Sequence, residues 1–152
     1  MKSKRGFTLI ELLVLIMLVG IVAAIALPGF GRLVENNRIS SLSNSVIGVL
    51  NYARSEAVRR GTIVNVVPTD GSYDDGITVQ DAGGNSLREI EGPGGGVSLA
   101  MTSGAALSFR ANGMSGQGNT VQYQVCADSG EDGTEISVTA GGLVRSAQIV
   151  CP

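Results

Sequence analysis

The side chains best suited to chemistry are few and far apart. Glu11 lies alone in an apolar segment, and Cys126 and Cys151 are the two cysteines of the chain. Two thiols cannot hold zinc by themselves, but they form one disulfide in an oxidising compartment. Each cysteine ends a predicted strand, so a bond would pin the last strand and stabilise the fold by roughly 3–4 kcal/mol. The alternative to a disulfide is that both cysteines are buried free thiols in a cytosolic domain.

Catalytic and metal-binding motifs are incomplete. The 152-residue chain has no histidine, which excludes the Ser-His and Cys-His nucleophiles and a histidine general base. Gly113–Gln117 lacks the last glycine of a nucleophile elbow, and Gly92–Gly96 lacks the lysine of a phosphate loop. The acidic run Asp128–Asp132 half-resembles a calcium loop, but its twelfth position is Thr139. We therefore expect no enzyme, no cofactor and no metal site.

Charge is distributed unevenly along the chain. Lys2, Lys4 and Arg5 precede the apolar segment, whereas three basic and ten acidic side chains follow Gly61, a balance of three minus ten, or −7. These are Arg88, Arg110 and Arg145 against Asp70, Asp74, Asp75, Asp81, Glu89, Glu91, Asp128, Glu131, Asp132 and Glu135. Nucleic-acid surfaces need a basic stripe, so this composition disfavours nucleic acid as a partner.

The segment Phe7–Leu27 is apolar except for Glu11. As a helix it would reach roughly 30 Å, the thickness of a bilayer core. The preceding basic cluster predicts a cytoplasmic N-terminus and an exported C-terminal part. A carboxylate at the bilayer centre costs about 2.5–3.5 kcal/mol, and less near the interface, so Glu11 calls for a functional explanation. A signal peptide cut near Ala24–Ala26 and a plain single-pass anchor are alternatives, and the latter leaves Glu11 unexplained.

The run Lys4–Leu12 closely resembles the class III signal of type IV prepilins and type II secretion pseudopilins. The resemblance implies that a prepilin peptidase cuts between Gly6 and Phe7 and that Phe7 is then N-methylated. It also implies that Glu11 attracts the amine of a neighbouring subunit during filament assembly. A charge pair in low dielectric is strong only when both members are present, which would make Glu11 a driving force for docking.

The elements beyond Leu27 predict an α+β fold. Pro28 would kink or locally melt the helix, and residues 28–61 continue as an amphipathic helix that ends at Gly61. Its apolar face consists of Ile39, Leu42, Val46, Val49, Leu50, Ala53 and Ala57. From Thr62 the period changes to two, which predicts an antiparallel sheet packed on that helix. The strands are expected at 62–67, 77–80, 86–91, 97–101, 106–110, 120–126, 135–140 and 143–151, with turns that include Thr69–Ser72 and Asp74–Gly76.

Three internal motifs resemble the FimT, FimU and GspH group of minor pilins and pseudopilins. They are the helix end Asn51–Gly61, the Phe-x-x-x-Gly turn Phe109–Gly113 and the Gly-x-x-Arg close Gly142–Arg145. Arg54 and Arg59 are interpreted as a solvated helix face. The chain lacks the tryptophan that often follows the first strands of this group, which weakens any transfer of detail to loop 70–85.

The resemblance implies a structural protein. We expect residues 1–6 to be a leader, 7–27 a transmembrane and assembly helix, 28–61 an amphipathic helix and 62–152 a β-rich periplasmic domain. The leading function is a minor pilin that primes or caps a type IV pilus, held in the inner membrane by its helix and bound to other pilins. Cys126 and Cys151 match the disulfide-bounded C-terminal loop of type IV pilins. The alternatives are an H-type pseudopilin of type II secretion, a major pilin, and a DNA receptor for transformation. FimT-type receptors carry Gly-Arg-x-Arg, whereas Gly142–Arg145 lacks one arginine.

Overall fold

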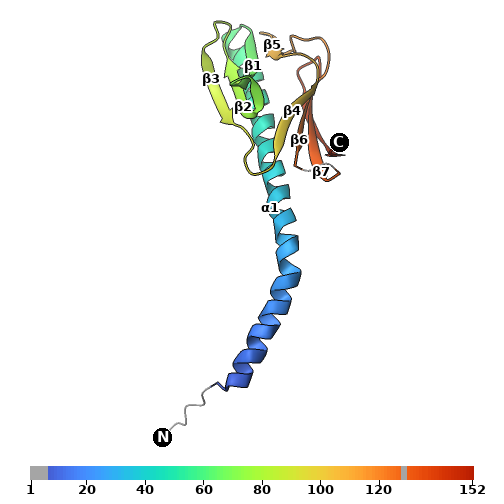
Figure 1. Ribbon diagram of the computed structural model, residues 1–152. Coiled ribbons are helices and arrows are strands. Elements are labelled where there is room, and N and C mark those ends of the chain that lie inside the picture. The colour runs from blue at the N-terminus through green and yellow to red at the C-terminus, as the bar shows by residue number, and fades with distance from the viewer. Residues whose placement is uncertain (1–6, 128–129) are drawn as a thin grey trace. The chain divides into compact units, whose positions relative to one another are not determined.

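The computed structural model describes residues 7–127 and 130–152, with the side chains of 25–29 and 32 outside that description. Gly6 and Asp128 therefore lie outside the described residues. Among the described residues, the helix α1 (Leu9–Arg60) comes first and is followed by strands (Figure 1). It divides into two compact units, residues 1–35 and 36–152.

Helical backbone continues through residues 27–29, where the sequence suggested a kink or local melting. Pro28 lacks a backbone N–H and so removes one hydrogen-bond donor from the helix. The residues in the turns before and after it keep their backbone donors. Among the described residues, no helix is long and apolar enough to cross a membrane.

The second half of α1 buries the predicted stripe. Val46, Leu50, Ala53 and Ala57 are inaccessible to solvent, Ile39 and Val49 nearly so, and Leu42 packs against them. The helix ends at Gly61, whose φ of 67° is a conformation that glycine adopts without strain. The amide of Thr62 then donates to the carbonyl of Ala57 at 3.3 Å, which closes the last turn as in a Schellman motif.

The strands form two antiparallel four-stranded sheets, with orders β3-β2-β1-β5 and β4-β6-β7-β8. Their bounds are β1 Val64–Thr69, β2 Ser72–Gln80, β3 Ser86–Glu91, β4 Ser98–Ser103, β5 Leu107–Phe109, β6 Val121–Cys126, β7 Asp132–Val138 and β8 Val144–Val150. Each of the eight predicted runs overlaps one strand. The α+β class is confirmed, with two sheets sharing one helix in place of a single sheet.

One predicted turn is absent. Asp74–Gly76 lies inside β2, and the turn before it is Thr69–Ser72, as expected. Gly76 has a φ of 128° and pairs with Glu91, and a side chain there would overlap the carbonyl oxygen of Ile90. The glycine therefore serves the close approach of β3 to β2 and not a reversal of the chain.

The core of unit 36–152 lies between the helical stripe and the inner faces of both sheets. Its largest buried side chains are Tyr123, Phe109 and Leu50. Tyr123 meets Tyr73 edge to face, with ring centroids 5.4 Å apart. Every buried apolar residue that the structure describes belongs to the segment 39–151, so this unit contains its own core.

Candidate assembly site

Glu11 lies in the first turn of α1, where Thr8 precedes the first helical residue. One carboxylate oxygen of Glu11 accepts hydrogen bonds from the amide and the hydroxyl of Thr8, both at 2.9 Å. The amide of Glu11 donates back to the Thr8 hydroxyl oxygen at 3.3 Å. This is a reciprocal capping box, in which two otherwise free helix-start amides are satisfied.

The capping box qualifies the expectation that Glu11 is unpaired. Within one chain, Thr8 already binds its carboxylate. Sequence reasoning missed Thr8, although a threonine three residues before a glutamate at the start of an apolar run is the recognised signal. The geometry leaves the carboxylate exposed and fixed close to the first turn, where a second donor can still reach it.

Apolar side chains surround this carboxylate. Phe7, Ile10, Val14, Leu15 and Leu18 line a shallow cavity of about 320 Å³ together with Glu11. From Leu9 to Val22 the large apolar side chains are 47–80% exposed. The segment Leu9–Val22 thus presents apolar surface in every direction, which is unfavourable in water and suits another apolar phase or another helix.

The three internal motifs meet at the far end of α1. The Arg54 guanidinium, part-buried, donates through Nε to the carbonyl of Gly113 at 3.0 Å. Gly142 approaches the same carbonyl so closely that a side chain there would overlap it. Helix, β5–β6 loop and β7–β8 turn are therefore joined at one point, and the interpretation of Arg54 as a solvated residue is wrong.

Glu56 was not singled out from the sequence, yet it is the one acid that α1 buries. Both its oxygens are bound: Arg59 donates to Oε1 at 3.0 Å and to Oε2 at 2.6 Å, and Arg60 donates to Oε2 at 2.7 Å. These bonds lower the pKa of Glu56 to about 2. Arg59 remains 67% exposed, so its predicted solvated position holds, but it also binds Glu56.

The predicted disulfide is present. Cys126, at the end of β6, is bonded to Cys151, just after β8, with Cα atoms 5.9 Å apart. The amide of Cys151 donates to Glu131 at 2.9 Å, and its carbonyl accepts from Gly130 at 3.0 Å. A side chain at Gly133 would overlap both sulfur atoms, so glycine is required under the bond.

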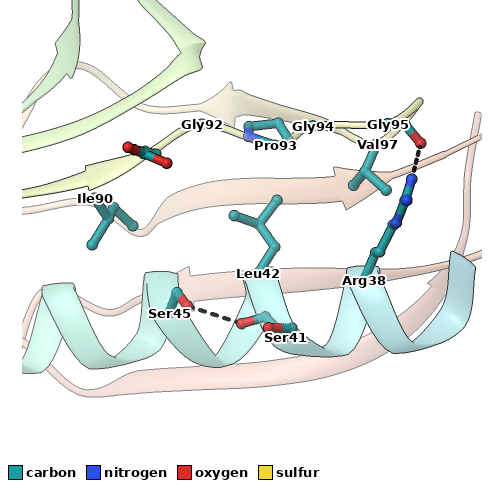
Figure 2. Close-up of a pocket in the computed structure, with 11 residues that line it drawn as sticks. Arg38, Ser41, Leu42, Ser45, Ile90, Gly92, Pro93, Gly94, Gly95 and Val97 are labelled. Carbon is teal, nitrogen blue, oxygen red and sulfur yellow. Dashed lines mark hydrogen bonds between the residues drawn. The ribbon is translucent and has the colours of Figure 1, made fainter. Parts of the chain in front are cut away.

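The glycine-rich run Gly92–Gly96 connects β3 to β4 and faces α1 across a cleft of about 640 Å³. Figure 2 shows Leu42 and Val97 reaching into this space and Arg38 spanning it. The Arg38 guanidinium donates to the carbonyl of Gly95 at 2.9 Å. The run connects two strands of different sheets and therefore does not form a hairpin.

The acidic residues do not gather into an ion site within residues 7–127 and 130–152, where no group of three potential metal ligands lies together. Asp128, the first position of the half-matched calcium loop, lies outside the described residues.

Removing the charge of Glu56 should change how the free energy of unfolding depends on pH at acidic pH. Because folding lowers its pKa from 4.5 to about 2, its contribution is present above pH 4.5 and is lost as the pH falls toward 2. We expect Glu56→Gln to be less stable than wild type at pH 7, with the gap closing between pH 4.5 and 2. Urea unfolding at several pH values in this range measures the difference in unfolding free energy. Arg59→Gln should make the unfolding free energy depend less on pH in the same range. A gap independent of pH would contradict this assignment.

Gly142→Ala should destabilise the globular unit by more than about 1 kcal/mol, because the residue has a φ of 77° and a methyl group would overlap the Gly113 carbonyl. Gly141→Ala is the matched control, since the nearest atom to a methyl there is 3.9 Å away, and it should stay within about 0.5 kcal/mol. Thermal unfolding compares the two, and equal losses would refute the packing argument.

Family profiles match both parts of the chain. The family described as "Type II transport protein GspH" matches residues 42–142. The "Prokaryotic N-terminal methylation motif" matches residues 1–27. The first match contains Arg54, Gly113 and Gly142, and the second contains Thr8 and Glu11.

Relatives and solved structures agree with these matches. A "Fimbrial protein" of Pseudomonas aeruginosa is 30% identical over 109 residues, which cover 68% of this chain and 71% of that protein. "Fimbrial protein EcpC" of Eikenella corrodens is 33% identical over 91 residues, 55% of this chain and 60% of that one.

Two solved structures share the fold. The type IV minor pilin FimU of Pseudomonas aeruginosa superposes with a TM-score of 0.65 at 23% identity, covering 74% of this chain and 90% of that one. The minor pseudopilin EpsH of Vibrio cholerae gives a TM-score of 0.56 at 13% identity, covering 72% and 96%. With the family match over residues 42–142 and the methylation motif, the chain belongs to the GspH group of type IV minor pilins and type II secretion pseudopilins.

Proposed function

We propose that this protein is a minor pilin that primes or caps a type IV pilus. The observation that carries the proposal is the division of the chain. One unit contains its own core, whereas the helix start presents exposed apolar side chains around a single fixed carboxylate, Glu11. An element built this way is unfavourable alone in water and gains free energy by packing against equivalent helices.

Processing would prepare that element for assembly. We propose that a prepilin peptidase cuts between Gly6 and Phe7 and that the amine of Phe7 is then methylated, which the match to the methylation motif supports. The cut leaves Thr8 and Glu11 in the chain, so the capping box survives it. The mature helix would begin with a cation at Phe7 and an anion at Glu11.

Glu11 would then act between subunits. Thr8 alone cannot satisfy every lone pair of the Glu11 carboxylate. In an apolar phase, burying the charge that has no partner costs free energy. The Phe7 amine of a neighbouring subunit supplies the missing cation when the two helices are offset by about one turn. Pairing across subunits would therefore both drive docking and set the axial offset.

The distribution of charge and apolar residues also suggests how the protein is anchored and oriented in the membrane. Lys2, Lys4 and Arg5 would keep the N-terminus in the cytoplasm, with the apolar helix in the inner membrane and residues 36–152 in the periplasm. The disulfide Cys126–Cys151 fits this placement, because disulfides persist in oxidising compartments.

A second candidate is an H-type pseudopilin of a type II secretion system. The family profile over residues 42–142 favours it, as does the shared fold with EpsH. The fimbrial relatives favour the pilus. DNA binding, as a third role, is disfavoured by the charge of −7 beyond Gly61.

Glu11→Ala should still insert into membranes and incorporate poorly into filaments, because the inter-subunit charge pair is lost. Immunoblots of sheared filaments and of membrane fractions give the amount of the protein in filaments relative to the amount in membranes. Glu35→Ala, which removes the next acid along α1, is the matched control and should incorporate normally.

Glu11→Gln separates assembly from helix capping. Glutamine at this position can still complete a capping box with Thr8, but it has no charge for a neighbouring amine. We expect Glu11→Gln to fail as Glu11→Ala does. Normal filament incorporation of Glu11→Gln would show that Glu11 serves only to cap its own helix.

A further inference from the structure

Exposed apolar side chains of the globular unit gather near the C-terminal end of α1. Among the described residues beyond 36, five large apolar side chains are 43–68% exposed: Val58, Ile63, Met114, Leu143 and Val150. Val58 packs directly over Gly113, because a side chain added at Gly113 would lie 3.1 Å from its Cγ2. Met114 follows Gly113, and Leu143 follows Gly142, which approaches the Gly113 carbonyl. We call Val58, Met114 and Leu143 the end patch.

Two arginines lie beside the end patch. A shallow cavity of about 510 Å³ is lined by Asn51, Arg54, Ser55, Val58 and Arg59, which are spaced by three and four residues and so share one side of the helix. Arg54 binds the Gly113 carbonyl through Nε alone, and within residues 7–127 and 130–152 its two terminal nitrogens bond no other group. Arg59 is held by Glu56 and stays 67% exposed. Both guanidinium groups can therefore meet a ligand that enters this cavity.

The charge at the end of the helix is opposite to that of the rest of the globular unit. Residues 51–61 contain three arginines and one glutamate, a balance of three minus one, or +2, whereas the balance beyond Gly61 is −7. Guanidinium groups bind carboxylates and phosphates, often through two parallel hydrogen bonds. The ligand that fits is therefore anionic.

The apolar side chains decide which kind of anion fits. A single-stranded nucleic acid stacks its bases on aromatic side chains, and the end patch consists of aliphatic and thioether side chains. The acidic remainder of the domain also repels a chain of phosphates. A protein surface with a carboxylate beside apolar side chains matches both features, since protein interfaces combine an apolar centre with a polar rim in which arginine is enriched.

We propose that the end patch and Arg54 bind a different pilin subunit, through a surface on which an aspartate or glutamate lies beside apolar side chains. This inference rests on the proposed function and specifies the partner surface. A chain that primes or caps a filament is surrounded by other pilins, so the partner is not a copy of this chain. Binding would remove three exposed apolar side chains from water and give the terminal nitrogens of Arg54 an anionic partner.

Cross-linking at the end patch tests the contact directly. The full chain is produced in cells that assemble pili, with the photoreactive amino acid p-benzoylphenylalanine in place of Leu143, which precedes β8. In the control, the same amino acid replaces Val150, which is 68% exposed at the other end of β8. We expect links from position 143 to a different pilin, at a peptide that contains aspartate or glutamate, several-fold more abundant than links from position 150. Links only to copies of this chain, links only to peptides without an acid, equal yields from both positions, or no links would overturn the inference.

Charge at position 143 tests the sign of the partner. Leu143→Glu and Leu143→Lys both remove the exposed leucine and differ in charge, and thermal unfolding should show that both keep the fold. With p-benzoylphenylalanine in place of Met114 in each variant, we expect cross-linking to the other pilin to be several-fold weaker for Leu143→Glu than for Leu143→Lys. Equal yields, or a higher yield for Leu143→Glu, would contradict an acidic partner.

Nucleic acid is the other ligand that arginines can bind. Gel shifts of the full chain in detergent, with single-stranded and double-stranded oligonucleotides at moderate salt, should show no complex. A complex with the wild-type chain would overturn the inference in favour of nucleic acid. The two proposals fail separately: if the chain enters filaments in a Glu11-dependent way but gives no link from position 143, only this inference is refuted, whereas absence of the chain from filaments refutes the proposed function.

Discussion

The burial of one stripe of α1 is the constraint on which the globular unit depends. Val46, Leu50, Ala53 and Ala57 reach complete burial because two sheets close on the same helical face. Each large aliphatic side chain so buried contributes about 1.5–3 kcal/mol, and the chain has few aromatic residues to replace them. The helix end is fixed separately, by the bond from Arg54 to Gly113 and by Glu56 between two arginines. The fold thereby holds the second half of α1, whereas the side chains of Leu9–Val22 take no part in this core.

The first half of α1 follows a different rule. Apolar side chains project from all sides of the segment Leu9–Val22, where the large ones are 47–80% exposed, so a sheet packed against one side would leave the others uncovered. Between Thr8 and Val22, only Thr8 and Glu11 have polar side chains, and they hydrogen-bond to each other at the helix start. One sequence thus specifies a domain with its own core and a helix start whose apolar side chains stay exposed within the single chain.

Sequence periodicity predicted the parts of this structure that depend on local pattern. The stripe from Ile39 to Ala57 and the eight strands were found because burial follows periods of 3.6 and two residues. Asp74–Gly76 was misread because glycine marks close backbone approach as well as turns. The division into two sheets depends on pairings between distant strands, which no local signal encodes. The contact among Arg54, Gly113 and Gly142 could be found only from the three-dimensional structure, because these residues are far apart in the sequence. The Thr8–Glu11 capping box, in contrast, could be predicted from the spacing of its two residues.

For Glu11 to act between subunits, the apolar helix must remain in the mature protein, and the mature chain must begin at Phe7, next to the capping box of Thr8 and Glu11. The most direct measurement is the mass of the N-terminal peptide of the chain purified from membranes of cells that contain a prepilin peptidase. The predicted result is a peptide that begins with N-methylated Phe7. A chain that begins after Ala26 would have lost the helix, and one that begins at Met1 would have no amine beside Glu11; either result would contradict the account.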